Sequence, residues 1–148
     1  MKIKRMTVSW ILLLVHNLNF IFWGLFWILK PERIFTDAFS AYAGRSWIEL
    51  RQSDHALAQL VEYYGRFLGI HGIIIAIILT FICFTAYRQR ERWSWIAILI
   101  GSTLGWFSAM AMDFIMKTPA IVWVDILPLA LVYASLAISA RDVFTSTS

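Results

Sequence analysis

Four apolar stretches, each long enough to cross a lipid bilayer, constrain the fold of this chain more than any other feature. They cover about residues 7–29, 64–87, 93–116 and 119–139. A helix of about 20 residues, rising about 1.5 Å per residue, spans the hydrocarbon core. Backbone groups in lipid must be paired internally, so such stretches fold as helices. We therefore predict an all-α, polytopic membrane protein, in which residues 1–148 form one integral domain with a four-transmembrane-helix bundle.

The composition agrees with a membrane protein. Hydrophobic residues make up 60% of the chain and charged residues only 15%, with a mean hydropathy of +0.70. Soluble domains carry about 25% charged residues. The single cysteine, Cys83, excludes an internal disulfide and any cysteine-based metal cluster supplied by this chain alone.

The distribution of basic residues predicts the orientation. Lys and Arg gather before the first stretch and between the second and third, at Lys2, Lys4, Arg5, Arg88, Arg90 and Arg92. Short basic flanks stay in the cytoplasm, so we expect both termini there. The same rule explains the net charge of +4 without any nucleic acid partner.

The segment 31–63 is the only sizeable piece that we expect outside the membrane. Residues 53–64 place apolar side chains at helical spacing, and Ser53 or Asp54 would cap that helix. This helix is expected to lie on the outer surface or to continue into the second span. The aromatic residues before it are expected to pack over the mouth of the bundle.

Glycines at intervals of three and four residues mark the second and third spans. They are Gly65, Gly69, Gly72, Gly101 and Gly105. Small residues at this spacing let helices in lipid approach closely. We expect these faces to pack within the chain; contact with another subunit and space for a flat cofactor are the alternatives.

Ionisable residues inside the predicted spans are the candidate catalytic residues. Arg66, His71, Asp113 and Asp125 all fall in the outer half of the membrane. A lone charge in hydrocarbon costs roughly 2.5 kcal/mol or more, so we expect these groups to meet. In this hypothesis Asp125 pairs with Arg66 or His71 across helices, and Arg66 has Glu62 one helical turn earlier. The alternative is that Arg66 and Asp113 extend to the membrane surface.

The first span has its own polar residues, with His16 and Asn19 predicted as an inward-facing structural pair and Asn17 on another face. His16 and His71 are the candidate cofactor ligands. They differ in depth by roughly 10 Å at the helical rise, which argues against one haem held by both. No cofactor or metal is predicted, and a haem, chlorin or quinone at a single histidine stays open.

The outline resembles the small four-helix bacterial inner-membrane proteins that include the DoxX-like families. The resemblance covers roughly residues 60–140 and lies in YYGRFLGIHG, in the basic hairpin YRQRERWSW and in the glycine-striped third span. It implies a bacterial inner membrane location and an accessory or redox-associated membrane subunit. The chain departs from the group in lacking cysteine pairs and in its long outer segment.

Three functions therefore stand as hypotheses. The first is an accessory or structural subunit of a larger membrane complex, in contact with lipids and other membrane subunits. The second is an intramembrane enzyme or redox protein acting on a lipid-soluble substrate such as a quinone or isoprenoid, with the four ionisable residues as its site. The third is a lipid- or pigment-binding protein.

Overall fold

The computed structural model describes residues 5–117 and 122–145, and these ranges contain helices and no strand. In chain order the helices are α1 (Arg5–Leu29), α2 (Pro31–Ala43), α3 (Trp47–Ser53), α4 (His55–Ile82), the π-helical turn η1 (Cys83–Tyr87), α5 (Arg92–Ile115) and α6 (Val122–Phe144). Four segments are long and apolar enough to cross a membrane: Arg5–Leu29, His55–Tyr87, Arg92–Ile115 and Val124–Phe144. The predicted all-α bundle is confirmed, while the predicted start of the last span at residue 119 lies outside the described residues.

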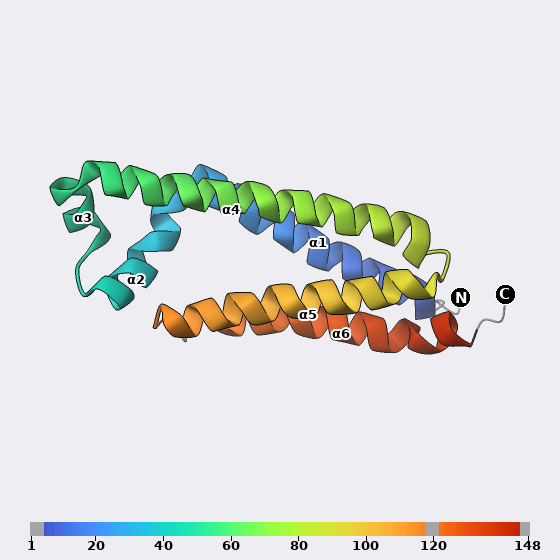
Figure 1. The fold of residues 1–148 in the computed structure, drawn as a ribbon. Coiled ribbons are helices and arrows are strands. Elements are labelled where there is room, and N and C mark those ends of the chain that lie inside the picture. Colours follow the sequence, from blue (N-terminus) through green and yellow to red (C-terminus); the bar gives the residue numbers. More distant parts are fainter. Residues whose placement is uncertain (1–4, 118–121, 146–148) are drawn as a thin grey trace.

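Helix α1 is the centre of the bundle. It packs against α4 on one side and α6 on another, and α5 packs mainly against α6. Figure 1 shows α4 and α5 meeting at η1 and diverging toward the opposite end of the bundle. The start of α1 and the end of α6 both lie at the η1 end. We call this end, with the start of α1, η1 and the end of α6, the terminal end.

Helices α1 and α4 approach each other closely at two glycines. A Cβ atom added to Gly69 would lie 2.6 Å from the backbone oxygen of Gly24, and one added to Gly24 would lie 2.8 Å from the oxygen of Gly69. The two backbones therefore touch directly. Apolar area does not drive helix association in lipid, so close contact at small residues such as these must hold the pair together.

The outer segment folds as two short helices with well-defined ends. Gly44 ends α2 in the left-handed region, with φ of 68°. Ser46 and Glu49 form a capping box at the start of α3. Asp54 accepts a hydrogen bond from the Leu57 amide and caps α4, which confirms one of the two predicted caps.

The outer segment packs on α4. Trp47, Leu50 and Ala58 form a small buried core, against which Phe39 packs. Helix α4 runs unbroken from His55 into the membrane span, so the amphipathic helix continues into that span instead of lying on the surface.

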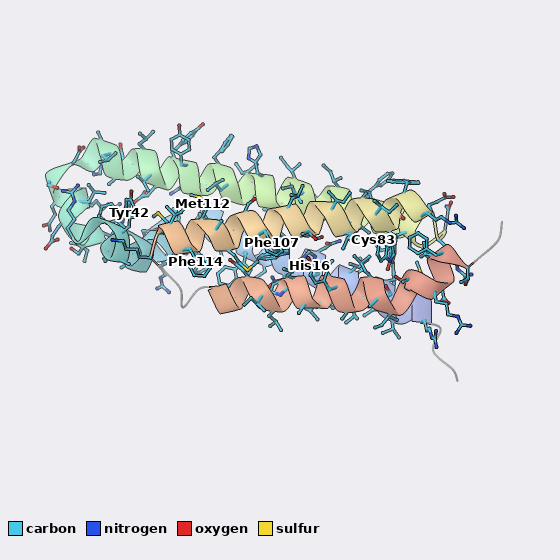
Figure 2. All side chains as sticks on the ribbon, turned by 60° about the horizontal axis from the view of Figure 1, so that its bottom comes forward. His16, Tyr42, Cys83, Phe107, Met112 and Phe114 are labelled. Atoms are coloured by element: carbon cyan, nitrogen blue, oxygen red, sulfur yellow. The ribbon has the colours of Figure 1, made fainter. Side chains whose placement is uncertain are left out.

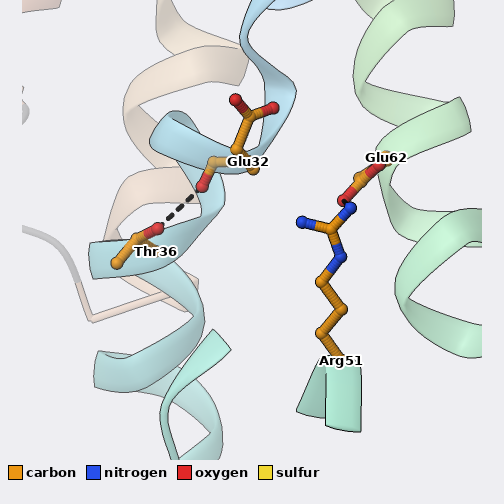
Figure 3. Close-up of polar contacts among 4 residues, drawn as sticks. All are labelled: Glu32, Thr36, Arg51 and Glu62. Carbon is orange, nitrogen blue, oxygen red and sulfur yellow. Dashed lines mark hydrogen bonds and ion pairs between the residues drawn. The ribbon is translucent and has the colours of Figure 1, made fainter. Parts of the chain in front are cut away.

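Polar contacts in the outer segment are shown in Figure 3. Arg51 of α3 pairs with Glu62 of α4 at 3.9 Å, and Thr36 donates to the backbone oxygen of Glu32 at 2.7 Å within α2. Glu62 thus pairs with Arg51, and its predicted pairing with Arg66 is not found among the described residues. The reason is that α3 folds back over α4 and brings Arg51 to the Glu62 carboxylate.

Candidate functional site

A buried chain of hydrogen bonds crosses the middle of the bundle at His16. The His16 side chain is 1% exposed and lies inside the bundle (Figure 2). Trp106 Nε1 of α5 donates to His16 Nε2 at 3.0 Å. An indole nitrogen is a donor only, so Nε2 must be the unprotonated nitrogen of the ring. The hydrogen of the neutral imidazole then sits on Nδ1, which donates to Asn17 Oδ1 at 3.2 Å.

Asn17 passes this chain of hydrogen bonds on to α4. Its Nδ2 atom donates to Thr80 Oγ1 at 3.2 Å and lies 4.0 Å from Cys83 Sγ. We call Trp106, His16, Asn17 and Thr80 the central network; it links α5, α1 and α4. Both ring nitrogens of His16 are used in it, so His16 has none left to ligate a metal or haem iron.

A second network of hydroxyl groups lies near the terminal end. Tyr87 of η1 hydrogen-bonds through its hydroxyl to Ser9 of α1 and to Ser139 of α6. Ser9 and Ser135 also bond to each other's backbone oxygens at 2.7 and 2.8 Å. All four side chains are fully buried. Such bonds between helices stabilise membrane bundles by about 0.6–1.7 kcal/mol each, and we call this group the hydroxyl cluster.

The two candidate residues on α4 face outward. Arg66 and His71 are both exposed, and His71 Nδ1 bonds to the Phe67 backbone oxygen at 2.8 Å. Helix α4 uses its opposite, glycine-containing face to pack against α1. The predicted pairing of Asp125 with Arg66 or His71 is therefore not found among the described residues, because α1 is the helix between α4 and α6.

The other two candidate residues do come together. The carboxyl groups of Asp113 on α5 and Asp125 on α6 lie within hydrogen-bonding reach of each other. Asp125 is 8% exposed. The structure thus brings together half of the predicted polar group, at the end of the bundle opposite η1.

The predicted glycine stripes behave in two ways. Gly65 and Gly69 are both buried, and Gly69 lies directly against Gly24 of α1. Gly72, Gly101 and Gly105, by contrast, have no described atom within 4 Å of an added Cβ. The packing within the chain that was expected for these three glycines is not found in the described ranges.

Several residues of the central network and the hydroxyl cluster were not predicted from the sequence. Asn17 was assigned to another face than His16, yet it is 2% exposed, whereas Asn19 is only half-buried. Two residues side by side can both be buried because α1 has helices on two sides. A signal for the hydroxyl cluster was present in Ser135 and Ser139, which lie one helical turn apart in an apolar span.

The described residues offer no ready metal centre, since no three His, Cys, Asp or Glu side chains gather within them. Fold and networks together define a small multi-pass membrane protein whose four apolar helices are tied by buried hydrogen bonds. Comparison with known protein families, with curated proteins and with solved structures found no match.

Proposed function

We propose that this protein is an accessory, structural subunit of a larger bacterial membrane complex. The open face of α5 is the observation that carries the proposal. Ala97, Gly101, Gly105 and Ser108 are all exposed along one side of α5, and the two glycines have no described neighbour within 4 Å of an added Cβ. We call these four residues the α5 small-residue face.

A transmembrane helix of a partner subunit fits the α5 small-residue face. Helices in lipid associate by van der Waals contact, and glycine allows two backbones to approach. This chain already uses that device once, where Gly24 meets Gly69. If the α5 small-residue face met only lipid, it would give up such contact and still carry the helix-destabilising cost of about 1 kcal/mol per glycine.

The use of the buried polar groups also favours a structural role. The central network and the hydroxyl cluster tie helices together, and both nitrogens of His16 are engaged. Arg66 and His71 are exposed on α4 and do not contribute to the site of Asp113 and Asp125 on α5 and α6.

Affinity purification of the tagged protein from its native membrane in a mild detergent tests the proposal. The wild type should bring down a constant set of larger membrane subunits. Gly101→Leu combined with Gly105→Leu should lose them, because the leucines fill the space of the docking helix. Ala130→Leu is the matched control, since Ala130 is exposed on α6. Purification of the wild type alone, or equal recovery with the glycine variant, contradicts the proposal.

One observation favours the intramembrane enzyme as a second candidate. Two neighbouring carboxyl groups are suited to general acid–base chemistry on a lipid-soluble substrate, and Asp113 and Asp125 lie close together. Infrared difference spectra of the wild type and Asp125→Asn should then differ by the carbonyl band of a protonated carboxyl group. Identical spectra would remove this candidate.

A further inference from the structure

A small pocket opens at the terminal end, outside every site described above. It lies between the start of α1 and the residue that follows η1, and is lined by Met6, Thr7, Trp10 and Arg88. Its volume is about 120 Å³. An engineered apolar cavity of about 150 Å³ accepts benzene, so this pocket has room for a phosphate group.

The pocket is lined by hydrogen-bond donors. Trp10 Nε1 is buried and makes no hydrogen bond within the described part of the chain. An indole N–H can only donate, and leaving it unsatisfied costs about 1–3 kcal/mol. The Arg88 guanidinium lies 5.7 Å from the centre of the Trp10 ring, and Thr7 adds a hydroxyl group. None of the described residues that line the pocket carries a carboxylate, so its complement is an anion that carries several acceptor oxygens.

The local backbone fixes this arrangement. The Arg88 amide donates to the Cys83 oxygen at 3.2 Å, the five-residue spacing of a π-helical turn. On the same turn Tyr87 is buried in the hydroxyl cluster. Arg88 therefore follows a firmly anchored residue. Trp10 is held as well, since its ring packs edge-on against Phe84 at 5.1 Å.

The surroundings are positively charged. The described residues of the terminal end carry acidic groups only at Glu91 and Asp142, against the arginines Arg5, Arg88, Arg90, Arg92 and Arg141. Arg92 donates to the Phe144 backbone oxygen at 3.4 Å, whereas Arg88 makes no ion pair among the described residues. Trp10 lies about 8 Å from the start of α1 at the helical rise, and tryptophan is enriched at membrane interfaces.

We propose that this pocket binds the phosphate group of an anionic phospholipid in the adjacent leaflet. The Arg88 guanidinium binds two phosphate oxygens in a bidentate geometry. The Thr7 hydroxyl donates to a third oxygen. Trp10 Nε1 donates to the ester oxygen beside it once the side chains that cover this atom move aside. The exposed Phe84 of η1, whose ring packs against Trp10, then contacts the acyl chains. The leaflet is the cytoplasmic one if the predicted orientation holds.

Native mass spectrometry of the full chain, released from nanodiscs, tests the proposal. The nanodiscs contain phosphatidylglycerol and phosphatidylcholine in equal amounts. The wild type should retain phosphatidylglycerol in preference to phosphatidylcholine. Arg88→Gln should weaken retention about tenfold, and Trp10→Phe, which keeps the ring and removes the N–H, about threefold or more. Arg90→Gln is the control, because Arg90 is exposed in the same hairpin and outside the pocket.

Other outcomes would overturn the proposal. Equal losses in Arg88→Gln and Arg90→Gln would mean that net charge alone attracts the lipid. Equal retention of both lipids would remove the preference for an anionic headgroup. Displacement of phosphatidylglycerol by millimolar inorganic phosphate would show a site for free phosphate. Circular dichroism of each variant, compared with the wild type, verifies that the bundle is intact.

Discussion

Replacing Gly69 with alanine should separate α1 from α4. The added Cβ would lie 2.6 Å from the Gly24 backbone oxygen, 2.9 Å from Trp27 Cβ and 3.0 Å from Ile28 Cγ1. A backbone oxygen and a Cβ atom cannot rotate away as the end of a long side chain can. The helices must therefore move apart at their closest point, and the contacts on either side of it weaken.

The expected magnitude is the difference of two effects. Overpacking a close contact costs about 1–3 kcal/mol, and the rigid atoms around Gly69 place it in the upper part of that range. Exchanging glycine for alanine in a helix gains up to about 1 kcal/mol. The variant should thus lose about 1–2 kcal/mol, a factor of roughly 5 to 30 in the unfolding equilibrium constant.

Gly72→Ala is the matched control, since Gly72 lies on the same helix and an added Cβ meets nothing within 4 Å. It should keep or raise the free energy of unfolding. Both variants can be unfolded by adding sodium dodecyl sulfate to mild-detergent micelles, with tryptophan fluorescence and helical circular dichroism as readouts. If both glycine variants unfold at the same surfactant fraction as the wild type, the Gly24–Gly69 contact does not hold α1 and α4 together.

Three further substitutions test the networks and a cap. Trp106→Phe removes the donor to His16 Nε2 and should cost about 0.6–1.7 kcal/mol in the same titration; an equal loss in a His16→Leu background would contradict the assigned bond. Asp54→Ala should cost about 1 kcal/mol and speed hydrogen exchange of the Leu57 amide, whereas Asp54→Asn should not. Tyr87→Phe should lower the free energy of unfolding by about 1 kcal/mol; an unchanged melting temperature would show that the hydroxyl cluster adds no stability.

The four apolar spans and the Asp54 cap of α4 could be predicted because their causes are local. The length of an apolar run and the hydrogen bond from Asp54 to an amide three residues later depend on neighbours in the chain. The partners of Asp125 and Glu62 could not be predicted in this way. Asp125 meets Asp113 and Glu62 meets Arg51 because α5 packs on α6 and α3 folds back on α4, and neither arrangement follows from local spacing.

The glycines show the same division. Gly69 and Gly101 have equivalent small-residue spacing in the sequence, yet the first is closed by Gly24 and the second is open. Gly24 is the only glycine within the predicted span 7–29. A single glycine forms no repeating small-residue pattern, so the sequence did not indicate it as a contact. A pattern of small residues indicates that a close approach is possible, but it does not name the partner helix.

By itself, the sequence determined that the chain forms four apolar helices and that polar groups would be buried among them, because these follow from hydrophobic length and the need to pair polar groups in lipid. Only the tertiary structure decided that α1 lies at the centre. With helices on two sides of α1, both His16 and Asn17 point into the bundle, and His16 accepts a hydrogen bond from Trp106. The same arrangement leaves the α5 small-residue face without a neighbouring helix among the described residues. The physical reason is that helices in lipid choose partners by the detailed fit of their surfaces, and that fit exists only once all the helices are in place.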